Sequence, residues 1–277
     1  MPELPEVETV KNDLAPHVVG RRIEGIDLFW ERMVLKPSLA EFRSRLIGRR
    51  ITGLDRRGKY LIFSLSGDGV LVIHLKMTGS LLVKLDSAEP EKFIRAVIYL
   101  DGGKAIHFRD PRKFGKMWLE AGREAIDNKL GVEPLSSAFT LEYLAKYLGN
   151  RSAPVKALLL EQSAIAGIGN MYADEVLFAT KIHPERAGKS LSSQEVGRLH
   201  RAIREVLRTG IRNKGASVDT YFRPDGTKGT AHAGFKVAYH HNESCPVCGA
   251  PIKRITVRNR GTYFCAHCQP EMEDISK

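Results

Sequence analysis

The start of the chain combines an amine with two carboxylates in the order Met1-Pro2-Glu3-Leu4-Pro5-Glu6. Pro2 is small enough that the initiator methionine is normally removed before it, so we expect a mature chain that begins with a secondary amine. A free α-amino group has a pKa near roughly 7.7 to 8.0, which leaves about a quarter of it neutral at the pH of the cytosol. Such an amine can attack an electrophilic carbon, and Glu3 and Glu6 could move protons beside it.

A bland interpretation of the same residues stays open at this point. Chains that begin with Met-Pro are common, and acidic residues in a first helical turn stabilise the helix dipole without any catalytic role. The pattern does predict a helix, because Pro5 suits the first helical position and Val7, Val10 and Leu14 recur at spacings of three and four. We expect Pro16 to end that helix.

Length and composition describe an ordinary globular protein. The 277 residues, 43% apolar and 27% charged, are enough for two domains with their own cores. No apolar run reaches the roughly 18 to 20 residues of a membrane span, and the acidic, proline-containing start does not resemble a secretory signal. We therefore expect a cytoplasmic protein that does not insert into membranes.

The charge balance favours a polyanionic partner. The formal net charge is +11, and the basic residues are clustered. Nucleic acid is the first candidate, although either cluster alone could be a solvated basic face. One cluster comprises Arg43, Arg45, Arg49, Arg50, Arg56, Arg57 and Lys59, and the other places Arg109, Arg112, Lys113 and Lys116 among Phe108, Phe114 and Trp118.

All four cysteines lie near the C-terminus as two Cys-x2-Cys pairs, Cys245/Cys248 and Cys265/Cys268, separated by sixteen residues. Paired thiolates on tight turns can complete a tetrahedral site, and the gap suits a two-stranded hairpin, so the spacing predicts one structural Zn²⁺. A pair of disulfides is the alternative, which a reducing compartment disfavours. Four thiolates leave no open position for water, so this zinc should not catalyse, and His267 should be a bystander.

The first half of the chain reads as short strands joined by turns. Gly67-Asp68-Gly69 and Asp101-Gly102-Gly103 are typical hairpin connections, which predicts a largely antiparallel sandwich or flattened barrel. We expect a helix over residues 37–46. The expected strands cover residues 23–29, 51–54, 59–65, 70–75, 80–83, 95–100 and 104–108.

From about Gly122 the apolar period becomes helical, over residues 141–148, 154–162, 171–180 and 193–212. A capping box, Ser192 to Glu195, opens the last helix. The turn Gly167-Ile168-Gly169-Asn170 offers flexible backbone and then an expected N-cap at Asn170, which could present amides to a phosphate, or could serve helix packing. The four glycines from Gly215 to Gly234 predict an irregular loop, and we expect its part from about Val218 to Gly234 to be mobile without DNA because it buries little surface.

Six motifs then follow one another along the chain. They are Pro2-Glu3-Leu4-Pro5-Glu6-Val7-Glu8, Arg57-Gly58-Lys59-Tyr60-Leu61, His74-Leu75-Lys76-Met77-Thr78-Gly79, Asp110-Pro111-Arg112-Lys113-Phe114-Gly115, Gly167-Ile168-Gly169-Asn170-Met171-Tyr172-Ala173-Asp174-Glu175, and the cysteine pairs with Arg260-Gly261-Thr262. In content and order they resemble those of bacterial formamidopyrimidine-DNA glycosylase, the 8-oxoguanine repair enzyme, over nearly the whole chain. The resemblance implies an α+β fold: an N-terminal antiparallel β-sandwich flanked by helices (1–133), a helical helix-two-turn-helix domain (134–235) and a zinc finger (236–277).

The resemblance also implies a mechanism. The Pro2 amine would attack C1′ of a damaged nucleotide, expel the base and form an iminium, which permits elimination of both flanking phosphates. By position, Glu3 would assist opening of the sugar ring, Lys59 would be the acid of the first elimination, and Arg260 would act in the second. A guanidinium, with a pKa above about 12, suits charge stabilisation better than proton donation.

The implied partner is damaged double-stranded DNA, bound by a monomer that needs no organic cofactor. Met77, Arg112 and Phe114 match the residues that fill the stack when a nucleotide is extruded, although without the resemblance Met77 and Phe114 would be assigned to the core. Their types fit that task, because a thioether and an aromatic ring can wedge a base step and a guanidinium can bond an orphaned cytosine. The contacts to phosphates or the lesion strand carried over from the family are Arg151, Lys156, Asn170 and Arg260.

Two other functions compete with this interpretation. Endonuclease VIII, a sister glycosylase for oxidised pyrimidines, shares the chemistry, but that branch typically has glycine where this chain has Leu4, and Arg112 and Phe114 follow the purine branch. A noncatalytic zinc-ribbon protein that binds nucleic acid would also explain the charge and the cysteines. Thr78, at a position near the lesion pocket that varies within the family, leaves the lesion preference open.

Overall fold

The computed structural model describes residues 1–218 and 221–271. By the density of internal contacts the chain divides into unit 1, which comprises Met1–Asn128 and Gly210–Ala233, and unit 2, which comprises Lys129–Thr209 and the chain from Gly234 onward. The finer division into three domains, with boundaries after residues 133 and 235, stays a prediction, and residues 272–277 of its last domain lie outside the described residues.

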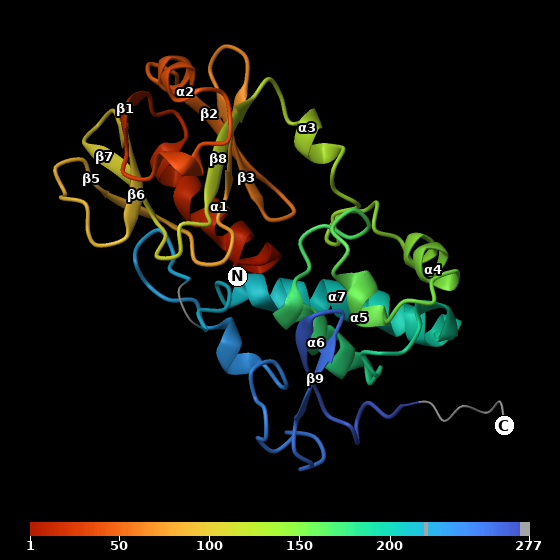
Figure 1. Ribbon diagram of the computed structural model, residues 1–277. Coiled ribbons are helices and arrows are strands. Elements are labelled where there is room, and N and C mark those ends of the chain that lie inside the picture. Colours follow the sequence, from red (N-terminus) through yellow and green to blue (C-terminus); the bar gives the residue numbers. More distant parts are fainter. Residues whose placement is uncertain (219–220, 272–277) are drawn as a thin grey trace. The chain divides into compact units, whose positions relative to one another are not determined.

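Unit 1 is built on two four-stranded antiparallel sheets, one in the order β1-β6-β7-β5 and the other in the order β2-β3-β4-β8 (Figure 1). The antiparallel sandwich expected from the sequence is confirmed. The strands are β1 (Ile23–Leu28), β2 (Ile51–Arg57), β3 (Tyr60–Leu65), β4 (Val70–His74), β5 (Ser80–Leu85), β6 (Ile94–Leu100), β7 (Lys104–Arg109) and β8 (Lys116–Glu120).

The turns between strands follow the glycine pattern. Gly67 and Gly69 have φ of 70° and 113° between β3 and β4, and Gly102 and Gly103 have φ of 78° and 73° between β6 and β7. Residues with a Cβ are strained at such angles, so these glycines close both hairpins without that cost. Strand β8 is absent from the sequence-based expectation, because its five residues become a strand only by pairing with β4.

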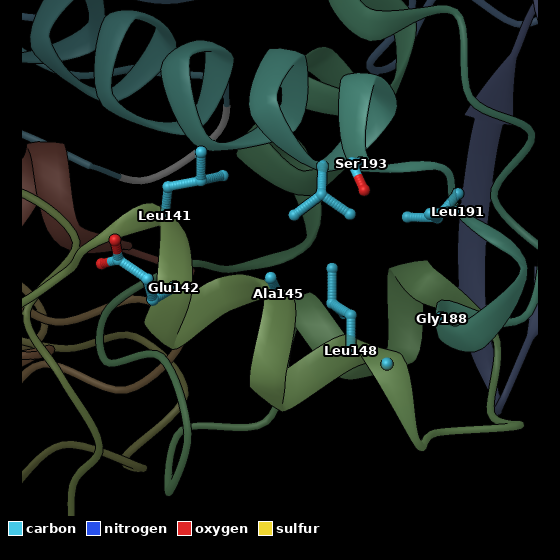
Figure 2. A pocket seen from close by; sticks show the side chains of 9 residues that line it. Leu141, Glu142, Ala145, Leu148, Gly188, Leu191 and Ser193 are labelled. Atoms are coloured by element: carbon cyan, nitrogen blue, oxygen red, sulfur yellow. The ribbon is translucent and has the colours of Figure 1, made fainter.

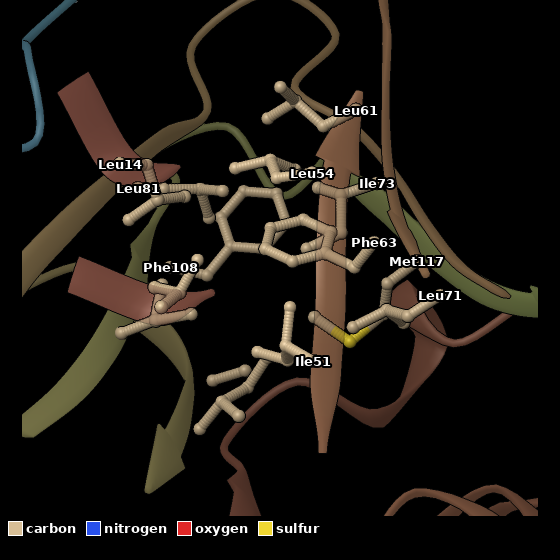
Figure 3. Packing of buried hydrophobic residues seen from close by; sticks show 14 of the residues in the cluster. Leu14, Ile51, Leu54, Leu61, Phe63, Leu71, Ile73, Leu81, Phe108 and Met117 are labelled. Atoms are coloured by element: carbon tan, nitrogen blue, oxygen red, sulfur yellow. The ribbon is translucent and has the colours of Figure 1, made fainter. Parts of the chain in front are cut away.

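Helix α1 (Leu4–Val18) supplies Val7, Val10 and Leu14 to a core cluster that also contains Phe63 of one sheet and Phe108 of the other. Figure 3 shows Leu14, Phe63 and Phe108 converging with the aliphatic residues of this cluster. Burial of a leucine or phenylalanine side chain stabilises a fold by about 1.5 to 3 kcal/mol, so the cluster holds α1 firmly against the strands.

The prediction that Pro16 ends α1 is wrong, because the helix continues to Val18. A proline in the last turn removes one backbone donor, and Val19 N–H still bonds Ala15 O at 3.0 Å. The remaining short elements of unit 1 are η1 (Glu31–Met33), α2 (Leu39–Leu46) and α3 (Glu124–Asp127). Helix α2 is capped by Ser38, whose hydroxyl accepts a bond from Glu41 N–H at 3.4 Å.

Unit 2 contains helices α4 (Leu141–Gly149), α5 (Val155–Leu159) and α6 (Asn170–Thr180), then η2 (Gly188–Ser190) and most of α7 (Ser193–Arg212). The last three residues of α7 and all but the last residue of η3 (Ala231–Gly234) belong to unit 1. The predicted capping box is confirmed: Ser192 N–H donates to Glu195 Oε2 at 2.8 Å and Glu195 N–H donates to Ser192 Oγ at 3.3 Å. Helix α5 is shorter than expected. The N-cap of α6 is Gly169, so the assignment of Asn170 as N-cap is wrong, and the Asn170 side chain bonds the zinc hairpin instead.

The hairpin expected between the cysteine pairs is formed by β9 (Lys253–Val257) and β10 (Arg260–Phe264). The two residues between the strands, Arg258 and Asn259, have φ of 47° and 61°, the signature of a type I′ turn, whose twist matches that of the strands. None of the helices in residues 1–218 and 221–271 is both long and apolar enough to cross a membrane.

Candidate active site and nucleic-acid interface

The predicted nucleophile and acids stand at the buried start of α1 in unit 1. Pro2 is buried, Glu3 is 2% exposed and Glu6 is fully buried. Glu3 N–H donates to Glu6 Oε2 at 2.8 Å, and the other Glu6 oxygen accepts Ala216 N–H at 2.7 Å. Glu6 therefore fixes the backbone beside Pro2 through a partner 210 positions away in the sequence.

Lys59 is buried in the tight turn that joins β2 to β3, close to His74 at the end of β4. Burial lowers the pKa of His74 to about 3, with further lowering from the ammonium groups of Lys76 and Lys59. Lys76 N–H donates to His74 Nδ1 at 2.9 Å, so the neutral ring carries its proton on Nε2. His74 is thus a neutral structural residue at physiological pH.

Two turns present the residues expected to enter the base stack: the Met77 turn (residues 75–79) and the Arg112 turn (residues 110–115). Asp110, which is 1% exposed, joins them. Its Oδ1 accepts a short bond from the Thr78 hydroxyl and a bond from Arg112 N–H at 3.3 Å, and its Oδ2 accepts Gly115 N–H at 2.7 Å. One carboxylate therefore fixes the two turns relative to each other.

The side chains at the tips of these turns are exposed, as the resemblance implies. Their apolar type alone would have predicted that Met77 and Phe114 are buried. Met77 is 41% and Phe114 is 44% exposed, and the Arg112 guanidinium lies 4.9 Å from the centre of the Phe114 ring. Below them the turns pack tightly on Phe108, since a Cβ on Gly79 or Gly115 would lie 2.9 or 2.6 Å from that ring. Packing at the glycines thus leaves Met77 and Phe114 to project outward.

In unit 2, Lys156 is fully buried. Its ammonium lies 2.7 Å from Asp174 Oδ1 and donates to Thr262 Oγ1 at 2.7 Å and to Gly261 O at 3.1 Å. Burial raises the pKa of Asp174, while contact with Lys156 lowers it in part. Lys156, paired with Asp174, therefore fixes β10 at Gly261 and Thr262, the two residues that follow Arg260.

The other predicted contacts of unit 2 are placed around the same strand or on the surface. Asn170 Nδ2 also donates to Gly261 O, at 2.8 Å, and Arg260 is exposed beside the hairpin turn. Arg151 is 49% exposed and lies over the Tyr147 ring, with Glu161 3.9 Å away. Lys156 and Asn170 thus converge on the backbone next to Arg260, and Arg151 stands apart from them.

The four cysteine thiols gather in unit 2 within 4.8 Å of one another. The Sγ atoms of Cys245 and Cys268 are 3.8 Å apart, and those of Cys248 and Cys265 are 3.4 Å apart. Four sulfurs at the usual Zn–S distance of about 2.3 Å are separated by about 3.8 Å at the corners of a tetrahedron, so this group fits a structural zinc ion. His267 is exposed and is not part of the group.

Comparisons with known proteins agree along the whole chain. Residues 1–117 match the formamidopyrimidine-DNA glycosylase N-terminal domain, residues 130–221 match the H2TH domain of the same proteins, and residues 242–270 match a zinc finger found in FPG and IleRS. The formamidopyrimidine-DNA glycosylase of Roseiflexus sp. is 45% identical over 97% of this chain and 100% of its own length.

This chain belongs to the formamidopyrimidine-DNA glycosylase family. Among solved structures, a Lactococcus lactis family member in complex with a Fapy-dG containing DNA is similar with a TM-score of 0.91 and 36% identity, covering 98% of this chain and 100% of that one. The Lactococcus lactis protein in complex with an abasic site containing DNA is similar with a TM-score of 0.91 and 35% identity, covering 97% and 100%.

A pocket in unit 2 lies away from these residues. It is a pocket of about 350 Å³ between α4 and the start of α7, and none of the predicted site residues lines it (Figure 2). Its walls are mainly apolar, with Leu141, Leu148 and Val196 among them. Because its lining contains none of the predicted catalytic residues, we do not assign the reaction to this pocket.

A second group of possible metal ligands, His183, Glu185 and Glu271, does not form a convincing metal site. Glu185 N–H donates to His183 Nδ1 at 3.3 Å, which puts the proton of the neutral ring on Nε2, the atom that lies 3.7 Å from Glu271. A metal at Nε2 would require the opposite tautomer. The contact is that of a histidine and an exposed carboxylate.

Sequence reasoning quoted Asp110, Asp174 and Glu175 within family motifs but gave them no role. Both oxygens of Glu175, a buried carboxylate, accept backbone bonds from residues 236–238 at 2.9 Å, which fixes the chain ahead of the zinc finger. Burial raises the pKa of Glu175. The residue type could have predicted these roles, because an acidic residue inside an otherwise apolar or turn-forming motif must bond a donor when it is buried.

Proposed function

We propose that this protein removes oxidised purines from duplex DNA and then cleaves the strand, with the amine of Pro2 as the nucleophile for both activities. The observation that carries the proposal is the buried start of α1, where Glu3 adjoins Pro2 and Glu6 fixes the Glu3 backbone. Family membership supports base-excision repair, and the names of the relatives support formamidopyrimidines as substrates, to which the resemblance adds 8-oxoguanine.

The chemistry requires an amine at the end of the mature chain. Once Met1 is removed, the Pro2 nitrogen attacks C1′ and loses its proton, and the bond electrons between C1′ and the base leave with the base. Glu3 then protonates the ring oxygen as the sugar opens, which leaves an iminium between the nitrogen and C1′. Loss of the C2′ proton and departure of the 3′ phosphate follow, and the 5′ phosphate leaves in the second elimination.

Lys59 and Arg260 serve the two eliminations in this proposal. The ammonium of Lys59 gives a proton to the first leaving phosphate, and the guanidinium of Arg260 stabilises the charge on the second. Met77, Arg112 and Phe114 fill the space from which the damaged nucleotide is extruded, which offsets the cost of unstacking.

The partner in this proposal is damaged double-stranded DNA, bound by a monomer in the cytoplasm with one structural zinc and no organic cofactor. Arg151 and Arg260 are exposed and suited to phosphates, and Asn170 stands beside Arg260. The phosphate contact expected of Lys156 stays a prediction, and its buried position requires that DNA binding expose the ammonium.

Borohydride trapping tests the nucleophile. The wild-type protein should form a permanent bond to DNA that carries 8-oxoguanine, because reduction of an iminium leaves a stable amine. Pro2→Gly retains an amine and should trap more slowly, whereas residues left ahead of Pro2 turn the amine into an amide and should abolish trapping. Glu3→Gln should strongly reduce base excision yet still permit cleavage at a preformed abasic site.

Peptide mapping of the reduced adduct decides between the two available amines. A crosslink at Lys59 with an unmodified terminal peptide would overturn the assignment of Pro2. The same assay with an oxidised thymine duplex tests the substrate class, since preferential cleavage of that duplex would assign the protein to the endonuclease VIII branch. A protein that binds both duplexes without trapping would be a noncatalytic module.

A further inference from the structure

The loop that follows α7, residues 214–230, is built onto one face of α1 within unit 1. Glu6 and Asp13 are seven residues apart in α1, which is two helical turns and the same face. Glu6 accepts the backbone N–H of Ala216 at 2.7 Å. The expectation that the chain from about Val218 to Gly234 buries little surface is wrong at Tyr221 and Ala231, which are each 4% exposed. Residues 219–220 lie outside the described residues.

The two ends of the loop are joined to each other. Thr230 N–H donates to Asn213 O and Ala231 N–H donates to Gly215 O, both at 2.9 Å. At Gly229 a Cβ would lie 2.1 Å from Lys214 O, so only glycine permits this approach. The ends form a closed stem, and the orientation of the stem sets the direction of the loop.

Asp13 contacts the loop at two points. Its side chain is 16% exposed, with Oδ1 3.2 Å from Lys214 Nζ and Oδ2 2.8 Å from Arg223 Nε. Lys214 belongs to the stem and Arg223 lies inside the loop, so one carboxylate fixes the stem and the loop at once. The Arg223 side chain is 22% exposed and the Lys214 side chain 49%, so we expect the Asp13–Arg223 pair to be the stronger of the two.

The loop is attached a second time at the free edge of β5. Val83 N–H donates to Pro224 O at 2.8 Å, and Phe222 N–H donates to Ser80 Oγ at 3.2 Å. The Arg109 guanidinium lies 5.3 Å from the centre of the Phe222 ring. Strand β5 begins immediately after the Met77 turn. The loop therefore contacts both α1 and the strand that follows this turn.

We propose that Asp13 is a positioning residue for base excision: it holds the described parts of the loop, residues 214–218 and 221–230, in one orientation relative to the Pro2 end of α1 and to the Met77 turn. This inference rests on the proposed function. Ordering a glycine-rich loop costs conformational entropy, and Asp13 makes that ordering part of folding rather than of the excision step. The loop can then act on a base that is still attached, whereas a preformed abasic site has none.

The test compares Asp13→Asn with Asp13→Glu, and uses Glu41→Gln as the matched control, since Glu41 forms an exposed ion pair with Arg45 away from the loop. Amide exchange of the free protein at Phe222 and Val83 should become roughly tenfold faster in Asp13→Asn, because the Phe222 donor and the Pro224 acceptor of Val83 N–H both move with the loop. Single-turnover excision of 8-oxoguanine should fall by roughly three- to tenfold, with cleavage of a preformed abasic site changed less than about twofold. Asp13→Glu should restore part of both losses, and Glu41→Gln should behave as wild type.

Three outcomes would overturn the inference: unchanged exchange in Asp13→Asn, faster exchange with normal excision, or equal loss on both substrates, which would indicate a general effect on the fold. Arg223→Gln gives an independent check, because its effect and that of Asp13→Asn should not add in the double variant if the two act through one ion pair. Absence of excision in the wild-type protein would refute the proposed function, while the exchange measurement would still show whether Asp13 holds the loop.

Discussion

Replacement of Asp110 by asparagine should separate the two turns that carry the inserting residues. The buried carboxylate accepts bonds from Thr78, Arg112 N–H and Gly115 N–H. Asparagine keeps one oxygen for Gly115 but turns an NH₂ group toward the partly buried Arg112 N–H, which loses its charged acceptor and keeps the Thr78 hydroxyl oxygen at 3.3 Å. The loss of a bond to a charged group, about 1.5 to 3 kcal/mol, together with weakening of the remaining bonds, gives an expected destabilisation of about 2 to 4 kcal/mol.

The assay is urea unfolding at constant pH, followed by excision of 8-oxoguanine under conditions in which the variant is fully folded. In Asp110→Asn the two turns should be more mobile before the reaction. Excision should then slow roughly tenfold, because the conformational entropy of the turns is lost during excision rather than on folding. Asp27→Asn is the control, since the Asp27 carboxylate accepts an exposed bond from the Tyr99 hydroxyl, and it should cost less than about 0.5 kcal/mol. A destabilisation below about 1 kcal/mol, or normal excision by a destabilised Asp110→Asn protein, would refute this reasoning.

Three further predictions concern acid stability, zinc and salt. The pKa of His74 is lowered to about 3, so its imidazole binds a proton more weakly in the folded than in the unfolded chain. The free energy of unfolding should therefore fall by up to about 4 to 5 kcal/mol as the pH is lowered from 6.5 to 3. A His74 ring that titrates near pH 6.5 by NMR would contradict this. Metal analysis should find about one zinc per chain, and chelation or Cys248→Ser should abolish DNA binding. Intact folding and DNA binding of the Cys248→Ser protein would contradict a structural role for zinc. Arg260→Gln should lower the slope of log affinity against log salt by about 0.9 while Arg45→Gln should not, and equal slopes would remove Arg260 from the phosphate contacts.

Features set by neighbouring residues could be predicted from the sequence alone. The glycines at 67, 69, 102 and 103 impose hairpins, Ser192 and Glu195 cap each other across three residues, and each Cys-x2-Cys pair lies on its own turn. Apolar periods of two and of about 3.6 residues then separate the strands from the helices. Together these local rules give the α+β class, the antiparallel sandwich and the zinc hairpin, and the order of the motifs gives the family.

Tertiary structure decided which side chains are buried and what they hold. Thr78 meets Asp110 from 32 positions away, Lys156 meets Thr262 from 106, and Glu6 meets Ala216 from 210. No local period encodes such pairings, because they depend on how the sheets and hairpins pack. That packing exposes Met77 and Phe114 despite their apolar character. It buries Lys156 despite its charge, because Asp174, the Gly261 carbonyl and the Thr262 hydroxyl replace its water.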